Sequence, residues 1–172
     1  MRKEISMAEL YDNNVVVEED TQAGKFLTFS LDGETYGIEI RYVIEIIGIQ
    51  AITVIPEVPQ YIKGIINLRG KVIPVIDVRL KFGKEEIEYN ERTCIIVIDI
   101  NEIQVGLIVD FVDEVLNIGD DDIADAPKSK TGFTNKYIKG IGKVNDKVQL
   151  LLDCEKLLKD DEVETLEAMV AN

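Results

Sequence analysis

An internal repeat constrains the fold of this chain more than any other feature of its sequence. Residues 26–40 align with residues 95–109 when Gly37 is placed over Gly106, at an offset of 69 residues, and the apolar positions then coincide. A polar pair interrupts the apolar pattern at the same place in both segments, where a hairpin would turn. The alignment predicts that each copy opens with a β-hairpin.

A second block repeats further along the chain. The run Tyr61-Ile-Lys-Gly-Ile65 recurs as Tyr137-Ile-Lys-Gly-Ile141 at an offset of 76 residues, so the second copy carries about seven extra residues near 117–136. Two blocks that repeat in the same order at nearly the same offset indicate a duplicated structural unit. The two copies span about residues 25–80 and 92–155.

Each copy has room for five short strands. In the first copy, β-rich runs at 25–31 and 36–40 predict one hairpin, and runs at 62–68 and 72–78 predict another. A short helical turn and a third strand are expected between the hairpins. Five short strands in about 55 residues suit a small closed barrel, which leaves no exposed edge. We therefore expect an all-β chain of two five-stranded barrels, with short helices at the connections and the C-terminus.

The two ends of the chain differ from the repeat. Residues 1–24 are acidic and have little apolar periodicity, which is typical of a flexible tail. Residues 160–172 carry an apolar stripe at helical spacing, which predicts a C-terminal helix docked on a barrel. The sequence leaves open whether segments near the C-terminus complete the first barrel.

Charge and composition exclude several classes of function. The chain has a formal net charge of −14 and no histidine. The acidity disfavours nucleic acids and anionic membranes, which are bound through Lys and Arg. Without histidine, a Ser-His-Asp triad cannot form. No apolar run approaches the roughly 18–20 residues that cross a bilayer, and the N-terminus lacks a secretion signal. We expect a cytoplasmic protein with no direct membrane insertion.

No group of residues forms a convincing catalytic or metal site. Cys94 and Cys154 follow strand-like apolar patterns, which favours reduced, buried thiols. The acidic run at 119–125 lacks the ligand spacing of a calcium loop, which favours a solvated loop. Asp77 and Asp153 are equivalent in the two copies, and we interpret them as turn or cap groups, with a catalytic carboxylate pair as the alternative. We predict no enzymatic activity, no metal and no cofactor.

Arg69 stands out because the two copies differ around it. The first copy turns its second hairpin with Arg69-Gly70, whereas the second copy has Asn145-Asp146 there. Since the fold accepts either turn, folding alone does not require Arg69. An arginine on a rigid hairpin suits the anchoring of a partner carboxylate through paired hydrogen bonds. An ordinary surface arginine is the alternative.

A series of short motifs follows the two copies in a fixed order. The series is Phe26-Leu-Thr-Phe, Tyr36-Gly-Ile-Glu-Ile, Val43-Ile-Glu-Ile, Tyr61-Ile-Lys-Gly-Ile-Ile-Asn-Leu-Arg-Gly, Val72-Ile-Pro-Val-Ile-Asp-Val, Val105-Gly-Leu-Ile-Val-Asp, Tyr137-Ile-Lys-Gly and Leu150-Leu-Leu-Asp. Over roughly residues 25–160, this series resembles the CheW family of chemotaxis coupling proteins. The segment 64–70 is the most distinctive part of the resemblance.

The resemblance implies two SH3-like barrels packed around a shared hydrophobic core. It also implies an adaptor that joins the cytoplasmic tips of methyl-accepting chemoreceptors to the regulatory domain of the CheA histidine kinase. Such a protein would associate with membrane-bound receptor arrays through its partners. The chain has room for neither a kinase nor a receiver domain, so the stand-alone form of the family fits best.

Carried over position by position, the resemblance implies two sets of partner-binding residues. The receptor-binding residues would be Glu45, Ile46, Arg69, Thr93, Val112 and Val115. The kinase-binding residues on the first barrel would be Val43, Gly64 and Asn67. Two rival classes remain, a small enzyme with a carboxylate pair and a nucleic-acid-binding SH3-like module, which the charge of −14 disfavours.

Overall fold

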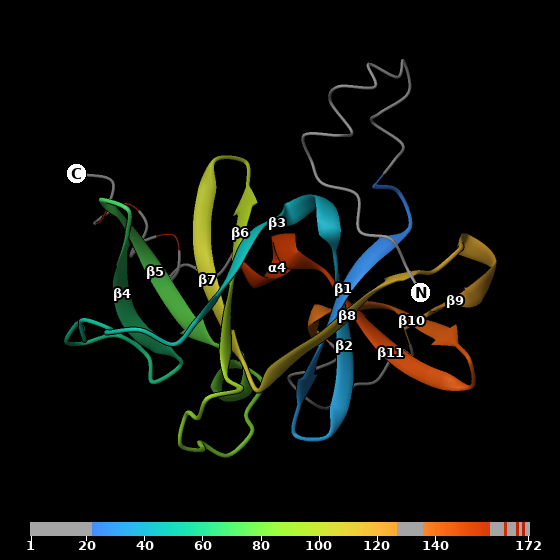
Figure 1. The fold of residues 1–172 in the computed structure, drawn as a ribbon, viewed down its shortest axis with the longest axis horizontal. Helices are drawn as coiled ribbons and strands as arrows, with labels where there is room; N and C mark the ends of the chain where they lie inside the picture. The colour runs from blue at the N-terminus through green and yellow to red at the C-terminus, as the bar shows by residue number, and fades with distance from the viewer. Residues whose placement is uncertain (1–21, 127–135, 159–163, 165–167, 169, 171–172) are drawn as a thin grey trace.

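Two curved β-sheets lie side by side along the long axis of the molecule (Figure 1). The computed structural model describes residues 22–126 and 136–158, together with Glu164, Ala168 and Val170. The predicted N-terminal tail therefore lies outside the described residues apart from a turn at 22–24. The predicted C-terminal helix at 160–172 also lies outside them, apart from the three separate residues.

Eleven strands and a few short helices make up the described chain. The strands are β1 (Lys25–Leu31), β2 (Glu34–Glu39), β3 (Val43–Gly48), β4 (Ile62–Leu68), β5 (Lys71–Asp77), β6 (Cys94–Ile100), β7 (Ile103–Val109), β8 (Phe111–Asn117), β9 (Ile123–Asp125), β10 (Ile138–Val144) and β11 (Lys147–Leu152). The helices are α2 (Val78–Lys81) and α4 (Cys154–Leu157), with 3-10 turns η2 (Ile40–Tyr42) and η3 (Asp120–Asp122).

The strands of the two sequence copies are exchanged between the sheets. The middle sheet has the order β3-β6-β7-β5-β4 and is built from residues 43–109. The terminal sheet has the order β8-β1-β2-β11-β10-β9 and is built from 25–39 and 111–152. Each sheet thus combines the first hairpin of one copy with the third strand and second hairpin of the other. The predicted all-β fold of two SH3-like barrels is confirmed, but neither copy closes on itself.

The exchange follows the repeat residue by residue. In the terminal sheet Gly37 lies opposite Leu151 in a parallel ladder, and in the middle sheet Gly106 lies opposite Val75. The same offsets of 69 and 76 residues relate Gly37 to Gly106 and Val75 to Leu151. A Cβ atom at Gly106 would lie 2.7 Å from a methyl group of Ile95 and 2.8 Å from one of Val75. Glycine therefore permits the close approach of these strands.

The hairpins turn where the repeat predicts. The turns of the first hairpins lie at Asp32-Gly33 and Asn101-Glu102, and both residues of each pair have positive φ. The second hairpins turn at Arg69-Gly70 and Asn145-Asp146 with the same sign of φ. Two consecutive residues with positive φ are typical of the type I′ turn, whose twist matches that of the strands. All four predicted hairpins are confirmed.

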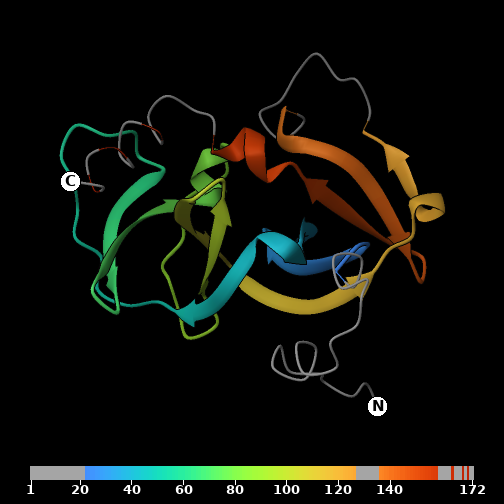
Figure 2. The same ribbon diagram turned by 90° about the horizontal axis from the view of Figure 1, so that it is seen from above.

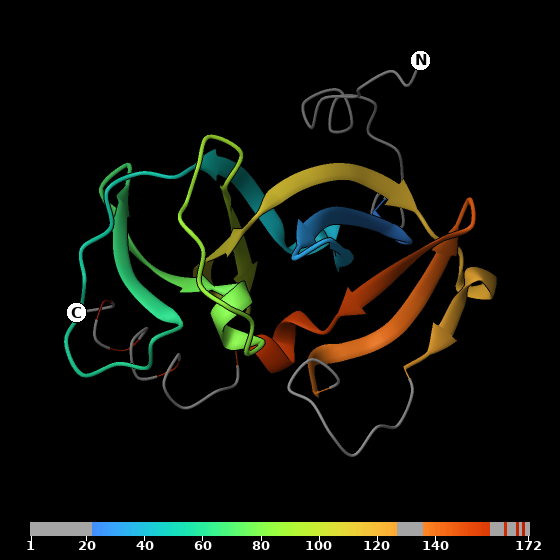
Figure 3. The same cartoon turned by 90° about the horizontal axis from the view of Figure 1, so that it is seen from below.

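A single large core joins the two barrels. It contains Phe29 and Ile38 from the terminal sheet together with Ile98 and Leu107 from the middle sheet, all of them buried. Helices α2 and α4 lie next to one another between the barrels (Figures 2 and 3), and their apolar side chains belong to the same core. The predicted shared hydrophobic core is confirmed.

Asp77 and Asp153 begin these two helices. A carboxylate oxygen of Asp77 accepts a hydrogen bond from the backbone N–H of Leu80 at 3.2 Å, and Asp153 accepts one from Lys156 at 3.1 Å. Each N-cap satisfies a backbone donor that the helix itself leaves unpaired. Asp77 also accepts a hydrogen bond from the hydroxyl of Tyr89 at 2.7 Å. The interpretation of the two aspartates as cap groups is confirmed.

A buried ion pair holds the point where the chain passes from the middle sheet to the terminal sheet. Asp110 lies between β7 and β8, and its carboxylate is 2.8 Å from the guanidinium of Arg79. The same carboxylate accepts a hydrogen bond from the backbone N–H of Asp32 at 2.9 Å. Arg79 is only 7% exposed and also donates to the backbone oxygen of Glu85 at 3.0 Å. The pair therefore ties α2 to the crossing and to the turn of the first hairpin.

Gly64 provides a test of the packing around β4. Its φ is +141°, and a Cβ atom there would overlap the backbone of Thr53, which exchanges two hydrogen bonds of 2.9 Å with Ile65. We predict that Gly64→Ala lowers the free energy of unfolding by at least about 2 kcal/mol, measured by urea denaturation.

Gly48→Ala is the matched control, because Gly48 has no positive φ and its Cβ position meets open space. This variant should stay within about 0.5 kcal/mol of the wild type. Equal losses for the two variants would contradict the packing role of Gly64.

Candidate docking surface

Two edge strands lie on one face of the molecule. Strand β3 ends one side of the middle sheet and β8 ends one side of the terminal sheet. Both face the viewer in Figure 1, and both run along the lower side in Figure 2. Within the described chain, no strand pairs with the outer edge of either. Open edges of this kind are natural sites for a partner.

Strand β3 exposes apolar side chains beside a charged pair. Ile44 and Ile46 are 47% and 42% exposed, which is unusual for isoleucines on an edge strand. Between them, Glu45 is partly buried and forms an ion pair with the exposed side chain of Arg69 at the tip of the β4–β5 hairpin. The strand also carries a bulge, because its register with β6 shifts between Val43 and Glu45. The result is a small apolar surface with a fixed charged pair at its side.

Arg69 occupies a strained position. Its φ is +53°, in the left-handed region that Asn, Asp and Gly tolerate better than other residues. The other three hairpin turns begin with Asp32, Asn101 or Asn145. The hairpin is nevertheless well held, because the side chain of Asn67 accepts a hydrogen bond from the N–H of Gly70 at 2.8 Å. A turn that keeps an unfavourable residue on a rigid support indicates a role for Arg69 outside folding.

Strand β8 contributes a second, flatter part of the face. Val112 and Val115 are partly buried and pack against the shared core. At the start of the strand, the guanidinium of exposed Arg92 lies 4.3 Å from the ring centre of Phe111. Thr93 is 3% exposed, and its hydroxyl accepts a hydrogen bond from the N–H of Asn90 at 2.9 Å. Thr93 therefore holds the loop that carries Arg92.

The residues expected to face the kinase lie on the middle sheet. Val43 begins β3 and packs against the shared core, Gly64 is buried in β4, and Asn67 is exposed near the hairpin tip. Next to Gly64, the segment after β3 forms an open hollow of about 320 Å³, whose lining includes Ile52, Val54 and Ile62. Val54 is 77% exposed. The structure thus brings an apolar hollow close to the buried Gly64.

Sequence reasoning missed two residues, Ile44 and Arg92, of the face formed by β3 and β8. Ile44 was not singled out from the sequence. The alternation of side chains along β3 shows which way Ile44 points only when the position of the bulge in that strand is known. The contact of Arg92 with Phe111 was also missed, because nothing in the pattern shows that the loop before β6 meets the start of β8. Among the nine expected site residues, the structure brings Glu45 and Arg69 into direct contact.

The described residues carry no cluster of metal-binding side chains. No group of three or more Cys, Asp or Glu side chains among them could hold a metal ion. Cys94 and Cys154 are free thiols, and burial raises the pKa of Cys154 to about 12. The acidic residues of η3 are exposed, as a solvated loop requires. Among the described helices, none is long and apolar enough to span a membrane.

Comparison with known proteins gives a consistent result. The model of the CheW-like domain family matches residues 25–162. The chain is similar to the chemotaxis protein CheW of Klebsiella aerogenes, with 38% identity over 84% of this chain and 87% of that protein. It is 35% identical to CheW of Helicobacter pylori over the same shares of the two chains. The crystal structure of the scaffolding protein TtCheW from Thermoanaerobacter tengcongensis superposes with a TM-score of 0.75 at 39% identity, covering 81% of this chain and 94% of that chain.

The strain at Arg69 makes a testable prediction about stability. We predict that Arg69→Asn leaves the free energy of unfolding within about 1 kcal/mol of the wild type, because relief of the left-handed strain offsets loss of an exposed ion pair. The reverse exchange at the equivalent turn, Asn145→Arg, should destabilise by about 1 kcal/mol. Urea denaturation measures both. A larger loss for Arg69→Asn than for Asn145→Arg would show that folding requires the arginine.

The burial of Cys154 predicts its reactivity. Because burial raises its pKa to about 12, the thiol stays protonated at pH 8, and we predict that a thiol reagent does not label it in the folded protein. In 6 M guanidinium the residue should react at the rate of a free thiol. Labelling followed by mass spectrometry of the Cys154 peptide distinguishes it from Cys94. Rapid native labelling of Cys154 would contradict the buried position.

Proposed function

The chain belongs to the CheW family of non-catalytic chemotaxis adaptors, and we propose that it couples the cytoplasmic tips of chemoreceptors to the regulatory domain of the CheA histidine kinase. The observation that carries the proposal is the face formed by β3 and β8. There an exposed apolar edge lies beside an arginine that is strained in the fold and supported by a rigid hairpin. Such a combination suits recognition of another protein.

The receptor tip is the partner assigned to this face. We assign its contacts to the residues expected from the sequence, namely Glu45, Ile46, Arg69, Thr93, Val112 and Val115. Ile46 and the two valines would contact apolar side chains of a helical hairpin, as amphipathic helices do in an apolar groove. Glu45 and Arg69 would set the register of the helix, because charged pairs at the rim govern specificity more than affinity. Thr93 would act indirectly, through the loop that it holds.

The kinase regulatory domain is assigned to the outer side of the middle sheet. Gly64 lies there next to Ile52, which lines the apolar hollow, and Asn67 is exposed near the tip of the same hairpin. Val43, which is also assigned to the kinase, begins β3 and packs against the shared core. Gly64 would contribute by letting the backbone of Thr53 come close and so shaping the hollow, since it is itself buried. The two sets of residues are neighbours on β3 and on the β4–β5 hairpin, and we propose that both partners bind at once.

Modest individual contacts are sufficient for this function. An adaptor inside an assembly of many receptors and kinases binds each partner at a high effective concentration. Each interface then needs only moderate affinity. Signals from the receptor would reach the kinase as small changes in how the rigid adaptor is held, since the shared core couples its two barrels.

Arg69→Asn tests the proposal without disturbing the fold. We predict that the wild type binds both a soluble receptor-tip fragment and the CheA regulatory domain in calorimetric titrations. Arg69→Asn should weaken binding of the receptor tip about tenfold, as expected for loss of a charged anchor.

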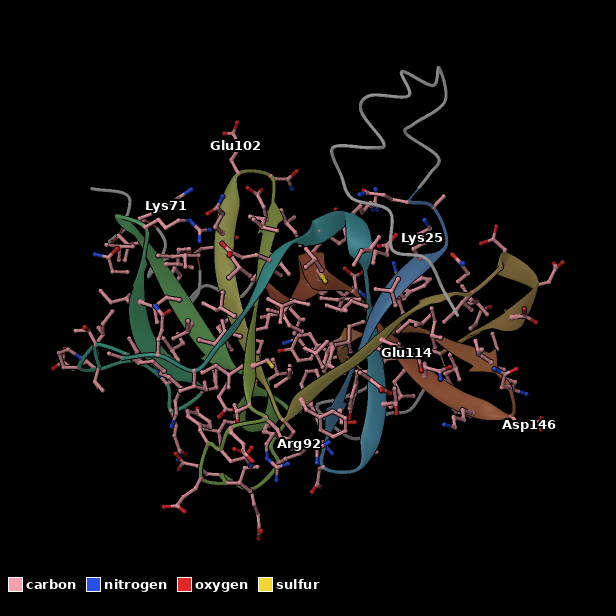
Figure 4. The ribbon with its side chains drawn as sticks, in the orientation of Figure 1. Lys25, Lys71, Arg92, Glu102, Glu114 and Asp146 are labelled. Carbon is pink, nitrogen blue, oxygen red and sulfur yellow. The ribbon has the colours of Figure 1, made fainter. Side chains whose placement is uncertain are left out.

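Lys71→Gln is the matched control, because it removes a positive charge two residues away at the same hairpin tip (Figure 4). It should change the affinity less than about twofold. If the wild type binds neither partner, the coupling function is wrong for this chain. If the two variants behave alike, Arg69 has no special role.

A further inference from the structure

A bulge interrupts strand β8. In the ladder with β1, Leu27 pairs with Val115 and Phe29 pairs with Val112. Asp113 and Glu114 therefore both lie opposite the single residue Thr28. Bulges at sheet edges redirect side chains and often lie next to functional sites.

The side chain of Thr28 holds this bulge in place. Thr28 is 0% exposed, and its hydroxyl donates a hydrogen bond of 2.8 Å to the backbone oxygen of Glu114. The backbone N–H of Glu114 donates back to the same hydroxyl at 3.1 Å. Both backbone polar groups of Glu114 are thus bound to one buried side chain. The equivalent of Thr28 in the middle sheet is Val97, which pairs with Glu45 directly in its ladder.

Glu114 is the equivalent of Glu45 in the second copy, but that copy has no arginine at the position equivalent to Arg69. Glu45 and Glu114 are equivalent at the offset of 69 residues, and Arg69 is equivalent to Asn145 at the offset of 76. Glu45 has its ion pair with Arg69 within the chain. Glu114 is exposed and forms no ion pair with any residue that the structure describes. Its carboxylate is therefore available to a cation from outside the chain.

We propose that the bulge displays Glu114 to bind a basic side chain of the receptor tip, next to the apolar contacts of Val112 and Val115. The inference rests on the proposed function, since it names a further determinant of the same docking face. The occupant follows from charge complementarity, because a carboxylate on a fixed backbone, with no cation paired to it among the described residues, selects a basic group. Figure 4 shows Glu114 on the face that carries β3 and β8, and it shows Glu102 far from it, at the tip of the β6–β7 hairpin.

The first test compares two carboxylates of equal charge. We expect Glu114→Gln to weaken binding of the receptor-tip fragment about three- to tenfold and to reduce the dependence of affinity on salt. Glu102→Gln should change neither by more than about twofold. Glu114→Gln should bind the CheA regulatory domain as the wild type does.

The second test addresses Thr28 as a positioning residue. Thr28→Val introduces the residue type that the second copy has at the equivalent position, Val97. It removes the hydroxyl and nearly conserves the side-chain volume. We expect Thr28→Val to weaken binding of the receptor tip, as Glu114→Gln does. Thr28→Ser keeps the hydroxyl and should restore most of the affinity. In the background of Glu114→Gln, Thr28→Val should have no further effect on binding.

The outcomes separate this inference from the function on which it rests. If the wild type binds the receptor tip and Glu114→Gln matches Glu102→Gln, the inference is overturned and the adaptor function stands. Equal effects of Thr28→Val and Thr28→Ser would overturn the positioning role of the hydroxyl. If the wild type does not bind the receptor tip at all, the adaptor function and the inference both fail.

Discussion

The parallel pairing of β2 with β11 and of β5 with β7 is the constraint on which the rest of the structure depends. These two ladders join the first hairpin of each sequence copy to the second hairpin of the other copy. Neither barrel can therefore form from one copy alone. The exchange also forces the chain to pass between the sheets, which encloses one large core between them. The relative position of the barrels is fixed by the same contacts that build each barrel.

The docking face is a consequence of this exchange. Because β3 pairs only with β6 and β8 pairs only with β1 within the described chain, each of these two strands leaves one edge unpaired, and both edges lie on the same side. The buried ion pair of Arg79 with Asp110 anchors the point where β7 passes into β8. A partner that contacts both edges would thus meet a surface with little freedom to rearrange. Such preorganisation lowers the entropic cost of binding.

Much of the fold follows from the sequence, because hairpins and turns are local. The repeat located all four hairpins, and Asp77 and Asp153 were interpreted from their equivalent positions as turn or cap groups, of which the structure shows the cap. The exchange of strands could not be predicted, since a repeat aligns equally well whether strands pair within a copy or between copies. The shared core was expected from the resemblance to the CheW family, because the strand pattern alone does not predict how the two barrels pack.

The site was less accessible from the sequence than the fold. Exposure of Ile44 depends on the bulge in β3, and the display of Glu114 depends on a hydrogen bond between residues 86 positions apart. Neither is a local property. Arg69 could be singled out by comparing the copies, but the left-handed backbone that makes it unusual is visible only in three dimensions. The partner assignments of the nine expected site residues stay proposals that the binding experiments address.

In the proposed function, one rigid molecule holds two partners at once. Sedimentation velocity of the wild-type chain mixed with the CheA regulatory domain and a receptor-tip fragment tests it most directly. We expect a ternary complex whose mass equals the sum of the three components, with neither partner displacing the other. If the receptor tip and the kinase domain instead compete, so that only binary complexes sediment, the chain has one docking site and the proposed adaptor mechanism is wrong.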